Sequence, residues 1–480
     1  MAMLTSVSGF PEWLPEDQLV EQRLIELLQQ KFQLYGFTPL ETRAVEPSQH
    51  LLMKGETDKE IYMLRRLQAD PDESDKDLGL HFDLTVPFAR YVVENKGKLV
   101  FPFRRYQIQK SWRGERPGLG RFREFLQADF DIINDKEISV LDDLEIIELL
   151  AEILQMLPIP KVRLLINHRK LLEGFCRGLG IEDPTPVMRI IDKLEKIGSE
   201  GVLEQLVLEA RTTPDQAQKC LQLGQIKTGD HKELVQQVQA TGVSHPLLEA
   251  GLEELEFVLE ELQGTPAELA LADLSLARGP DYYTGTIFEA KFAELPRYPS
   301  IAGGGRYDRL AATASGGQLP GVGVTVGVSR LLGVTLHEGL LGANRKTTSC
   351  VLVALGSEER RSRSVKAARA LRQRGIPCEI YPSPDKYGKQ IRFAEKKGIP
   401  YVWFPAEANG GADQVVDEVV GEVADQVKDI RSGVQIAAQA EAWTPPVSDL
   451  EVQINWDEAA YQRVLQDPLY TGKQNPEREG

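Results

Sequence analysis

The amino-acid sequence predicts an α+β protein in which strand-forming and helical regions are followed by a smaller α/β unit. Two alternating runs, at 101–112 and 122–133, flank a segment rich in glycine and proline, which is the pattern of two strands and the loop between them. Apolar residues then recur with helical spacing from Arg169 to about Gly242. After Thr348, short strand and helix patterns alternate, and this order favours a small domain with a mainly parallel sheet.

The predicted hairpin carries an unusual positive charge. Between Arg104 and Arg123 there are seven basic residues against a single acid, Glu115; the basic residues are Arg104, Arg105, Lys110, Arg113, Arg116, Arg121 and Arg123. Guanidinium groups bind phosphate oxygens in pairs, so the hairpin is a candidate site for a polyanion. Charge alone leaves open the alternative of a solvated basic hairpin.

The composition is that of a globular chain of two to four domains, with 480 residues, 42% apolar and 27% charged. No apolar run approaches the length that spans a bilayer, and the N-terminus lacks the basic and apolar regions of a targeting signal. The four cysteines form no CxxC pair, and the six histidines have no metal-ligand spacing. We therefore expect a cytoplasmic protein that does not contact membranes and has no metal site of its own side chains.

The N-terminal region predicts a helix at 17–34 with acidic residues in its first turn, followed by a strand at 37–45. A second strand, at 81–87, is predicted to lead into a helix at 88–94. Asp83 and Thr85 lie two residues apart on this strand, so they face the same side and can together hold an ammonium group. The alternative for this pair is a turn-forming aspartate and a helix cap.

The order of residues in the hairpin, WRGER at 112–116 and GRFREF at 120–125, resembles motif 2 of class II aminoacyl-tRNA synthetases and above all the histidyl-tRNA synthetase family. The segments LSLARGPDYYTGTIFEA (274–290) and GGGRYD (303–308) are similar to two signatures of that family. Residues 321–331 resemble its motif 3, and residues 17–46 its motif 1, which forms the dimer interface. The resemblance covers roughly the first 435 residues. It implies a class II catalytic domain on a mainly antiparallel sheet, a helical insertion and a C-terminal α/β anticodon-binding domain.

The resemblance also implies roles for particular residues. Arg113 and Arg278 are the catalytic candidates, because in the family they stabilise the charge on the α-phosphate of ATP. The expected histidine-binding residues are Asp83, Leu84, Thr85, Arg113, Gln127, Asp131, Arg278, Tyr282, Tyr283 and Tyr307. The expected ATP-binding residues are Arg113, Glu115, Arg121 and Arg330. Taken without Arg278 beside them, Tyr282 and Tyr283 also fit a half-buried strand pair.

We thus predict a histidine–tRNA ligase that uses ATP and Mg²⁺, acts on histidine and tRNA(His), and forms a homodimer. The expected domains are the catalytic domain in two parts (1–168 and 245–343), the helical insertion (169–244), the anticodon-binding domain (348–437) and an acidic extension (438–480). The chain has a net charge of −16, but residues 358–397 hold twelve Lys/Arg against five acids, which suits a module that binds RNA.

Two alternatives remain at this point. One is a non-catalytic, histidine-sensing regulatory paralogue that acts with ATP phosphoribosyltransferase; such relatives usually lose the signature arginine and the anticodon domain, both of which are present here. The other is a synthetase for a different amino acid, which the RGPDYYT segment opposes. No family role is implied for the extension beyond residue 437.

Overall fold

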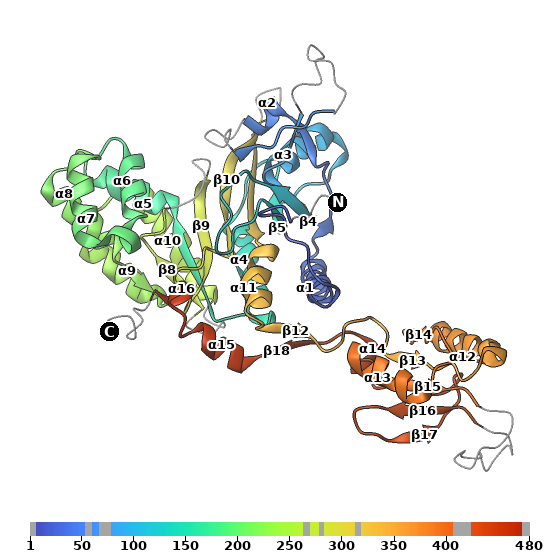
Figure 1. The fold of residues 1–480 in the computed structure, drawn as a ribbon. Coiled ribbons are helices and arrows are strands. Elements are labelled where there is room, and N and C mark those ends of the chain that lie inside the picture. The colour runs from blue at the N-terminus through green and yellow to red at the C-terminus, as the bar shows by residue number, and fades with distance from the viewer. Residues whose placement is uncertain are drawn as a thin grey trace, which may run out of the picture. The chain divides into compact units, whose positions relative to one another are not determined.

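The computed structural model describes residues 6–52, 60–66, 78–262, 269–277, 283–312, 318–406 and 424–472. The chain forms two compact units (Figure 1). Unit 1 comprises residues 1–11, 26–338 and 459–480, and unit 2 comprises residues 12–25 and 339–458. Each unit therefore contains segments that lie far apart in the sequence.

A nine-stranded sheet forms the centre of unit 1. Its order is β1 (Thr38–Pro39), β4 (Phe103–Trp112), β5 (Glu124–Ile133), β11 (Gln318–Val326), β10 (Ala302–Ala312), β9 (Tyr283–Phe292), β6 (Val162–His168), β8 (Ala270–Asp273) and β7 (Lys227–Thr228). Neighbouring strands are antiparallel except for the pairs β1–β4 and β6–β8. The predicted α+β fold with a mainly antiparallel sheet is confirmed.

The basic hairpin has the predicted form. β4 and β5 pair antiparallel from Phe103↔Ile133 to Trp112↔Glu124, and residues 113–123 connect them. The connection is closed by a bridge between Gly118 and Arg121, and Gly120 between them has a φ of 61°, which glycine adopts without a steric penalty. The loop is thus held at a defined turn between its two strands.

The first helices and strands differ in part from the sequence prediction. α1 (Pro15–Leu34) is confirmed, but the strand expected at 37–45 is only β1, and β2 (Val45–Pro47) follows and pairs with β3 (Leu78–Leu80). Proline at the end of β1 has no amide hydrogen with which to extend a ladder. α2 (Ser48–Leu51) is a single turn.

The prediction of a strand through Asp83 and Thr85 is wrong. β3 ends at Leu80, Leu84 has helical backbone angles, and α3 (Thr85–Asn95) begins three residues earlier than expected. Asp83 Oδ1 accepts a hydrogen bond of 3.0 Å from the Val86 amide, which satisfies one of the open donors at the helix start. Pro87 is compatible with this start, because the first turn of a helix tolerates proline.

Helices fill the region after β6, as the sequence predicts. They are α5 (Arg169–Gly178), α6 (Pro184–Ile191), α7 (Leu194–Leu208), α8 (Pro214–Gly224) and α9 (His231–Ala240), followed by α10 (Pro246–Glu261). The expected breaks are at the starts of α6 and α8, where Asp183 and Thr213 act as N-caps before a proline. α10 packs on α5 and β6, next to the β6–β8 end of the sheet (Figure 1).

Unit 2 contains a five-stranded sheet in the order β14 (Cys378–Ile380), β13 (Val351–Val353), β15 (Tyr401–Phe404), β16 (Gln426–Asp429) and β17 (Gln435–Ala437). β13 is parallel to both β14 and β15, with α12 (Arg361–Gln373) and α13 (Tyr387–Lys397) between them in sequence, as predicted. β16 and β17 add antiparallel pairs. The sheet as a whole is therefore mixed, and the prediction of a mainly parallel sheet is wrong.

The extension beyond residue 437 is structured through residue 472. α14 (Val447–Leu450) and β18 (Ile454–Trp456) belong to unit 2, where β18 pairs with β12 (Leu341–Ala343). α15 (Glu458–Val464), apart from its first residue, and α16 (Pro468–Thr471) belong to unit 1. The extension thus contributes to both units.

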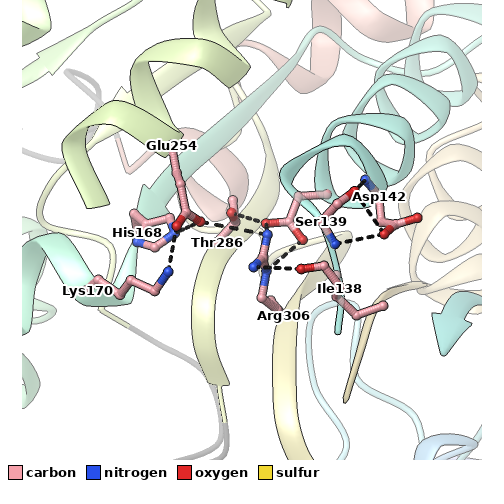
Figure 2. Close-up of polar contacts among 9 residues, drawn as sticks. Ile138, Ser139, Asp142, His168, Lys170, Glu254, Thr286 and Arg306 are labelled. Carbon is pink, nitrogen blue, oxygen red and sulfur yellow. Dashed lines mark hydrogen bonds and ion pairs between the residues drawn. The ribbon is translucent and has the colours of Figure 1, made fainter. Parts of the chain in front are cut away.

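A buried ionic cluster joins two helices of unit 1 to strands of its sheet (Figure 2). Asp143, on α4 (Val140–Met156), forms an ion pair of 2.8 Å with Arg306 on β10 and also accepts a hydrogen bond from the Thr286 hydroxyl on β9. Glu254 on α10 accepts a bond of 3.0 Å from His168 Nε2 and lies 3.7 Å from the Arg306 guanidinium. The cluster therefore connects two helices to three neighbouring strands.

We expect the Asp143–Arg306 pair to be necessary for the stability of unit 1. Asp143→Ala should lower the free energy of unfolding by about 3–5 kcal/mol, because it leaves a buried guanidinium without its nearest counter-ion. Glu173→Ala is the matched control, since it breaks an exposed pair with Arg177 (49% and 33% exposed side chains) and should cost less than about 1 kcal/mol. Urea unfolding of both variants measures the difference, and equal costs would show that the cluster is not a major source of stability.

Candidate functional site

A pocket of about 300 Å³ opens in unit 1 among residues of the predicted site. It is bordered by the start of α3, the β4–β5 loop, β5, β9, β10, β11 and the start of α11 (Val328–His337). The lining residues are Asp83, Thr85, Arg113, Glu115, Gly120, Arg121, Phe122, Phe125, Leu126, Gln127, Tyr283, Glu289, Ser300, Ile301, Ala302, Gly303, Thr325, Gly327 and Arg330.

One part of the pocket is strongly cationic. Arg113 donates from Nε to the Phe82 carbonyl at 2.9 Å, and its guanidinium carbon lies 5.2 Å from the centre of the Phe125 ring. Arg330 donates to the carbonyls of Gly120 at 3.0 Å and Ser300 at 2.6 Å. Burial and the nearby charge of Arg113 lower the pKa of Arg330. An anion placed here would relieve that repulsion, so this part of the pocket fits a phosphate chain.

Another part of the pocket is acidic and polar. Asp83, Thr85, Gln127 and Glu289 line it. Gln127 is buried, and its Oε1 has no hydrogen-bond partner in the described part of the chain. A buried acceptor of this kind is rarely left unpaired, so a ligand with N–H donors fits this part of the pocket.

Behind the polar part, Asp131 joins two buried groups. Its Oδ1 accepts a bond of 3.0 Å from the Tyr307 hydroxyl, and its Oδ2 lies 2.6 Å from Arg105 Nη2. Glycine in β11 makes room for this arrangement, because a Cβ on Gly323 would lie 2.0 Å from Asp131 Oδ1 and one on Gly321 would lie 2.5 Å from the Tyr307 ring. Asp131 and Tyr307 are both buried and are not among the lining residues.

The predicted site residues thus fall into four groups. Asp83, Thr85, Arg113, Glu115, Arg121, Gln127, Tyr283 and Arg330 line the pocket. Asp131 and Tyr307 lie behind it, and Leu84 is fully buried and is not among the lining residues. Arg278 and Tyr282 lie outside the described residues.

Sequence reasoning missed several residues of this site. Glu289 lines the pocket, where its carboxylate accepts a hydrogen bond from Ser300 and lies 3.2 Å from Lys291. The signal in the sequence was a single acidic residue in the segment that forms β9. Arg105 was counted only as one charge of the basic hairpin, although it is fully buried.

Asp129 is a further buried acid next to this site. It lies between Gln127 and Asp131 on the same side of β5, and burial raises its pKa to about 7. Arg105 opposes this effect, whereas the charges of Asp131 and Asp83 add to it. Asp129 and Asp131 therefore share the positive charge of Arg105.

Comparison with known proteins agrees with this geometry. Residues 9–331 match the model of the histidyl-tRNA synthetase family, and residues 349–404 match that of the anticodon binding domain. A histidine–tRNA ligase of Cutibacterium acnes is 48% identical over 94% of this chain and 98% of its own length. The chain belongs to the histidyl-tRNA synthetase family.

Solved structures support the same assignment. The crystal structure of histidyl-tRNA synthetase from Nostoc sp. PCC 7120 has a TM-score of 0.79 and 32% identity, over 92% of this chain and 98% of that one. A Bacillus halodurans protein described as an ATP phosphoribosyltransferase regulatory subunit/histidyl-tRNA synthetase has a TM-score of 0.66 at 21% identity, over 81% and 96% of the two chains, and shares the fold.

Within the described ranges, no helix combines the length and apolarity needed to cross a membrane.

We expect Asp129 to make stability depend on pH. Its pKa is raised from 3.8 to about 7 in the folded chain, so between these values the folded state alone holds the extra proton, and stability falls as pH rises from about 4 to about 7. Asp129→Asn should remove this contribution, which is at most about 4 kcal/mol. The variant should therefore gain stability over the wild type at pH 8 relative to pH 5 in urea unfolding. A difference between the two proteins that does not change with pH would contradict the raised pKa.

Proposed function

We propose that this protein is a histidine–tRNA ligase that forms histidyl-adenylate from histidine and ATP and then transfers the histidyl group to tRNA(His). One observation carries the assignment to this pocket: Arg113, Arg121 and Arg330 line the same cavity as Asp83 and Gln127. A triphosphate needs the arginines, whereas an amino acid with an ammonium group and an imidazole ring needs the acid and the amide.

In the first step, the histidine carboxylate attacks the α-phosphorus of ATP and pyrophosphate leaves. We assign Arg113 and Arg278 to the α-phosphate, where they stabilise the charge that develops on its oxygens. Arg330 and Arg121 bind the phosphates that depart, and Glu115 orients the nucleotide. Asp83 and Thr85 hold the ammonium group, while Gln127, Tyr282 and Tyr283 face the rest of the amino acid.

In the second step, the terminal 3′-hydroxyl of tRNA attacks the activated carbonyl and AMP leaves. No side chain is required as a dedicated general base, since positioning and electrostatics supply much of the rate. ATP enters as its Mg²⁺ complex, and Glu289 and Glu115 are carboxylates in the pocket of the type that this cation prefers.

Unit 2 is assigned to tRNA binding. Residues 349–404 match the anticodon binding domain, and α12 presents an exposed basic surface that includes Lys366 and Arg369. Positive charge on this surface attracts the phosphate backbone. Resemblance to motif 1 further suggests a homodimer, and the proposed role in charging tRNA suggests that the protein acts in the cytoplasm.

Amino acid-dependent exchange of pyrophosphate into ATP tests the proposed activity. The purified chain should catalyse exchange with histidine and with no other standard amino acid, because the pocket pairs phosphate-binding and imidazole-binding groups. Histidine-dependent association with an ATP phosphoribosyltransferase, in the absence of exchange, would favour the regulatory paralogue instead.

We expect Arg278 to stabilise the transition state more than it binds histidine. Arg278→Ala should lower the rate of exchange by about a hundred- to a thousandfold with little change in the Michaelis constant for histidine. Arg278→Lys should restore part of the rate, because it keeps the charge but not the planar fork. A hundredfold higher Michaelis constant at unchanged turnover would make Arg278 a carboxylate anchor only.

A further inference from the structure

The C-terminal extension reaches the pocket indirectly through two tyrosines. Tyr470, on α16, is 1% exposed, and its ring lies 6.4 Å from that of Tyr298 with an angle of 29° between the planes. Tyr298 is itself buried, at 3% exposure. Offset aromatic pairs at this separation attract each other beyond the burial of their surfaces.

Tyr298 in turn contacts the backbone of Arg330 and the turn to which the Arg330 side chain is bound. Its hydroxyl donates to the Arg330 carbonyl at 2.7 Å, at the start of α11. Its ring fills the space beside Gly120, where a Cβ would lie 2.8 Å from the Tyr298 ring. Because Arg330 Nε donates to the Gly120 carbonyl, Tyr298 touches the arginine's backbone and the turn to which its side chain is bound.

The hydrogen bonds of Arg330 make its position sensitive to this support. Nε and Nη1 are bound to backbone carbonyls, and Nη2 has no hydrogen bond or ion pair in the described part of the chain. The guanidinium is thus oriented by main-chain atoms from the β4–β5 loop and from residue 300. A shift of either segment moves the charge that faces the pocket.

Tyr470 is anchored at its other side. Its hydroxyl donates to Glu338, just after α11, and its carbonyl accepts a bond of 3.1 Å from the Arg297 amide. Arg297 Nη1 also donates to the Pro468 carbonyl at 3.3 Å. α16 is therefore fastened to the segment before Tyr298 and to the end of α11, and its Tyr470 ring packs against that of Tyr298.

We propose that Tyr470 is a positioning residue, which acts through Tyr298 to hold Arg330 and the Gly120 turn in place for the β- and γ-phosphates of ATP. This inference rests on the proposed function of the pocket. It gives the extension a role in nucleotide binding, although the extension contributes no side chain to the pocket lining in the described residues.

Steady-state exchange kinetics of full-length variants test this role. Tyr470→Ala should raise the Michaelis constants for ATP and pyrophosphate roughly ten- to hundredfold, because a small displacement of a positioning group has effects of this size. The Michaelis constant for histidine and the inhibition constant of AMP, which lacks the β- and γ-phosphates, should change less than about threefold. Tyr470→Phe keeps the ring and should restore most of the affinity for ATP.

Leu469→Ala is the matched control, since Leu469 lies on the same helix with 53% exposure and should leave all constants unchanged. Unaltered ATP constants in Tyr470→Ala, or equal losses for ATP, histidine and AMP, would overturn the proposal. If Tyr470→Ala does not fold, Tyr298→Phe decides the question, because it removes only the hydroxyl bound to Arg330. That variant should weaken ATP selectively, and wild-type constants would overturn the proposal.

The ATP-induced rise in melting temperature separates the two levels of inference. A wild type that shows this rise without histidine-dependent exchange would contradict the proposed function alone. Loss of the rise in Tyr470→Ala, but not in Leu469→Ala, supports the positioning role whatever the amino acid proves to be.

Discussion

The ion pair between Arg105 and Asp131 is the constraint on which the construction of the pocket depends. Both side chains are almost fully buried, and removing two charges from water costs several kcal/mol for each unless they are paired and hydrogen-bonded. Arg105 lies on β4 and Asp131 opposite it on β5. The Tyr307 hydroxyl, from β10, donates a hydrogen bond to the same carboxylate. Arg105 also stacks over Phe88 of α3, 4.0 Å from the ring centre. One pair of charges thus aligns three strands and the helix that begins at the pocket.

Four arginines of unit 1 differ in the groups that balance their charge. This difference separates the arginines that support the fold from those that are available to a ligand. Arg306 and Arg105 are paired with buried carboxylates, so their charges are used within the protein. Arg330 is oriented by main-chain carbonyls, and Arg113 by the Phe82 carbonyl with Glu115 as distant as 3.7 Å. Carbonyl dipoles fix direction without cancelling a full charge. In a chain with a net charge of −16, the part of the pocket around Arg113 and Arg330 can therefore remain positive.

Local patterns predicted much of the fold, whereas contacts between distant segments had to be seen. The hairpin, the helices after Arg169 and the strands of unit 2 up to Phe404 follow from periodicity and turn residues. The sequence pattern offers the helix cap by Asp83 only as an alternative. It predicts Pro87 as the end of a strand, although Pro87 lies in the first turn of α3. β16 and β17 lack the run of bulky apolar residues that predicted the similarly short β13 and β15. The approach of Gly323 to Asp131 joins residues nearly two hundred positions apart, and no local signal reports it.

The division of unit 1 into separate stretches of sequence has a consequence for biosynthesis. Residues 459–480 belong to this unit but leave the ribosome after all of unit 2. The sheet and its helices can assemble earlier, because their strands lie within the first 338 residues. Tyr298 then lacks its stacking partner Tyr470 until α16 has been synthesised. Completion of unit 1 is thus tied to the synthesis of the segment that follows unit 2, and a chain that stops before α16 lacks part of unit 1.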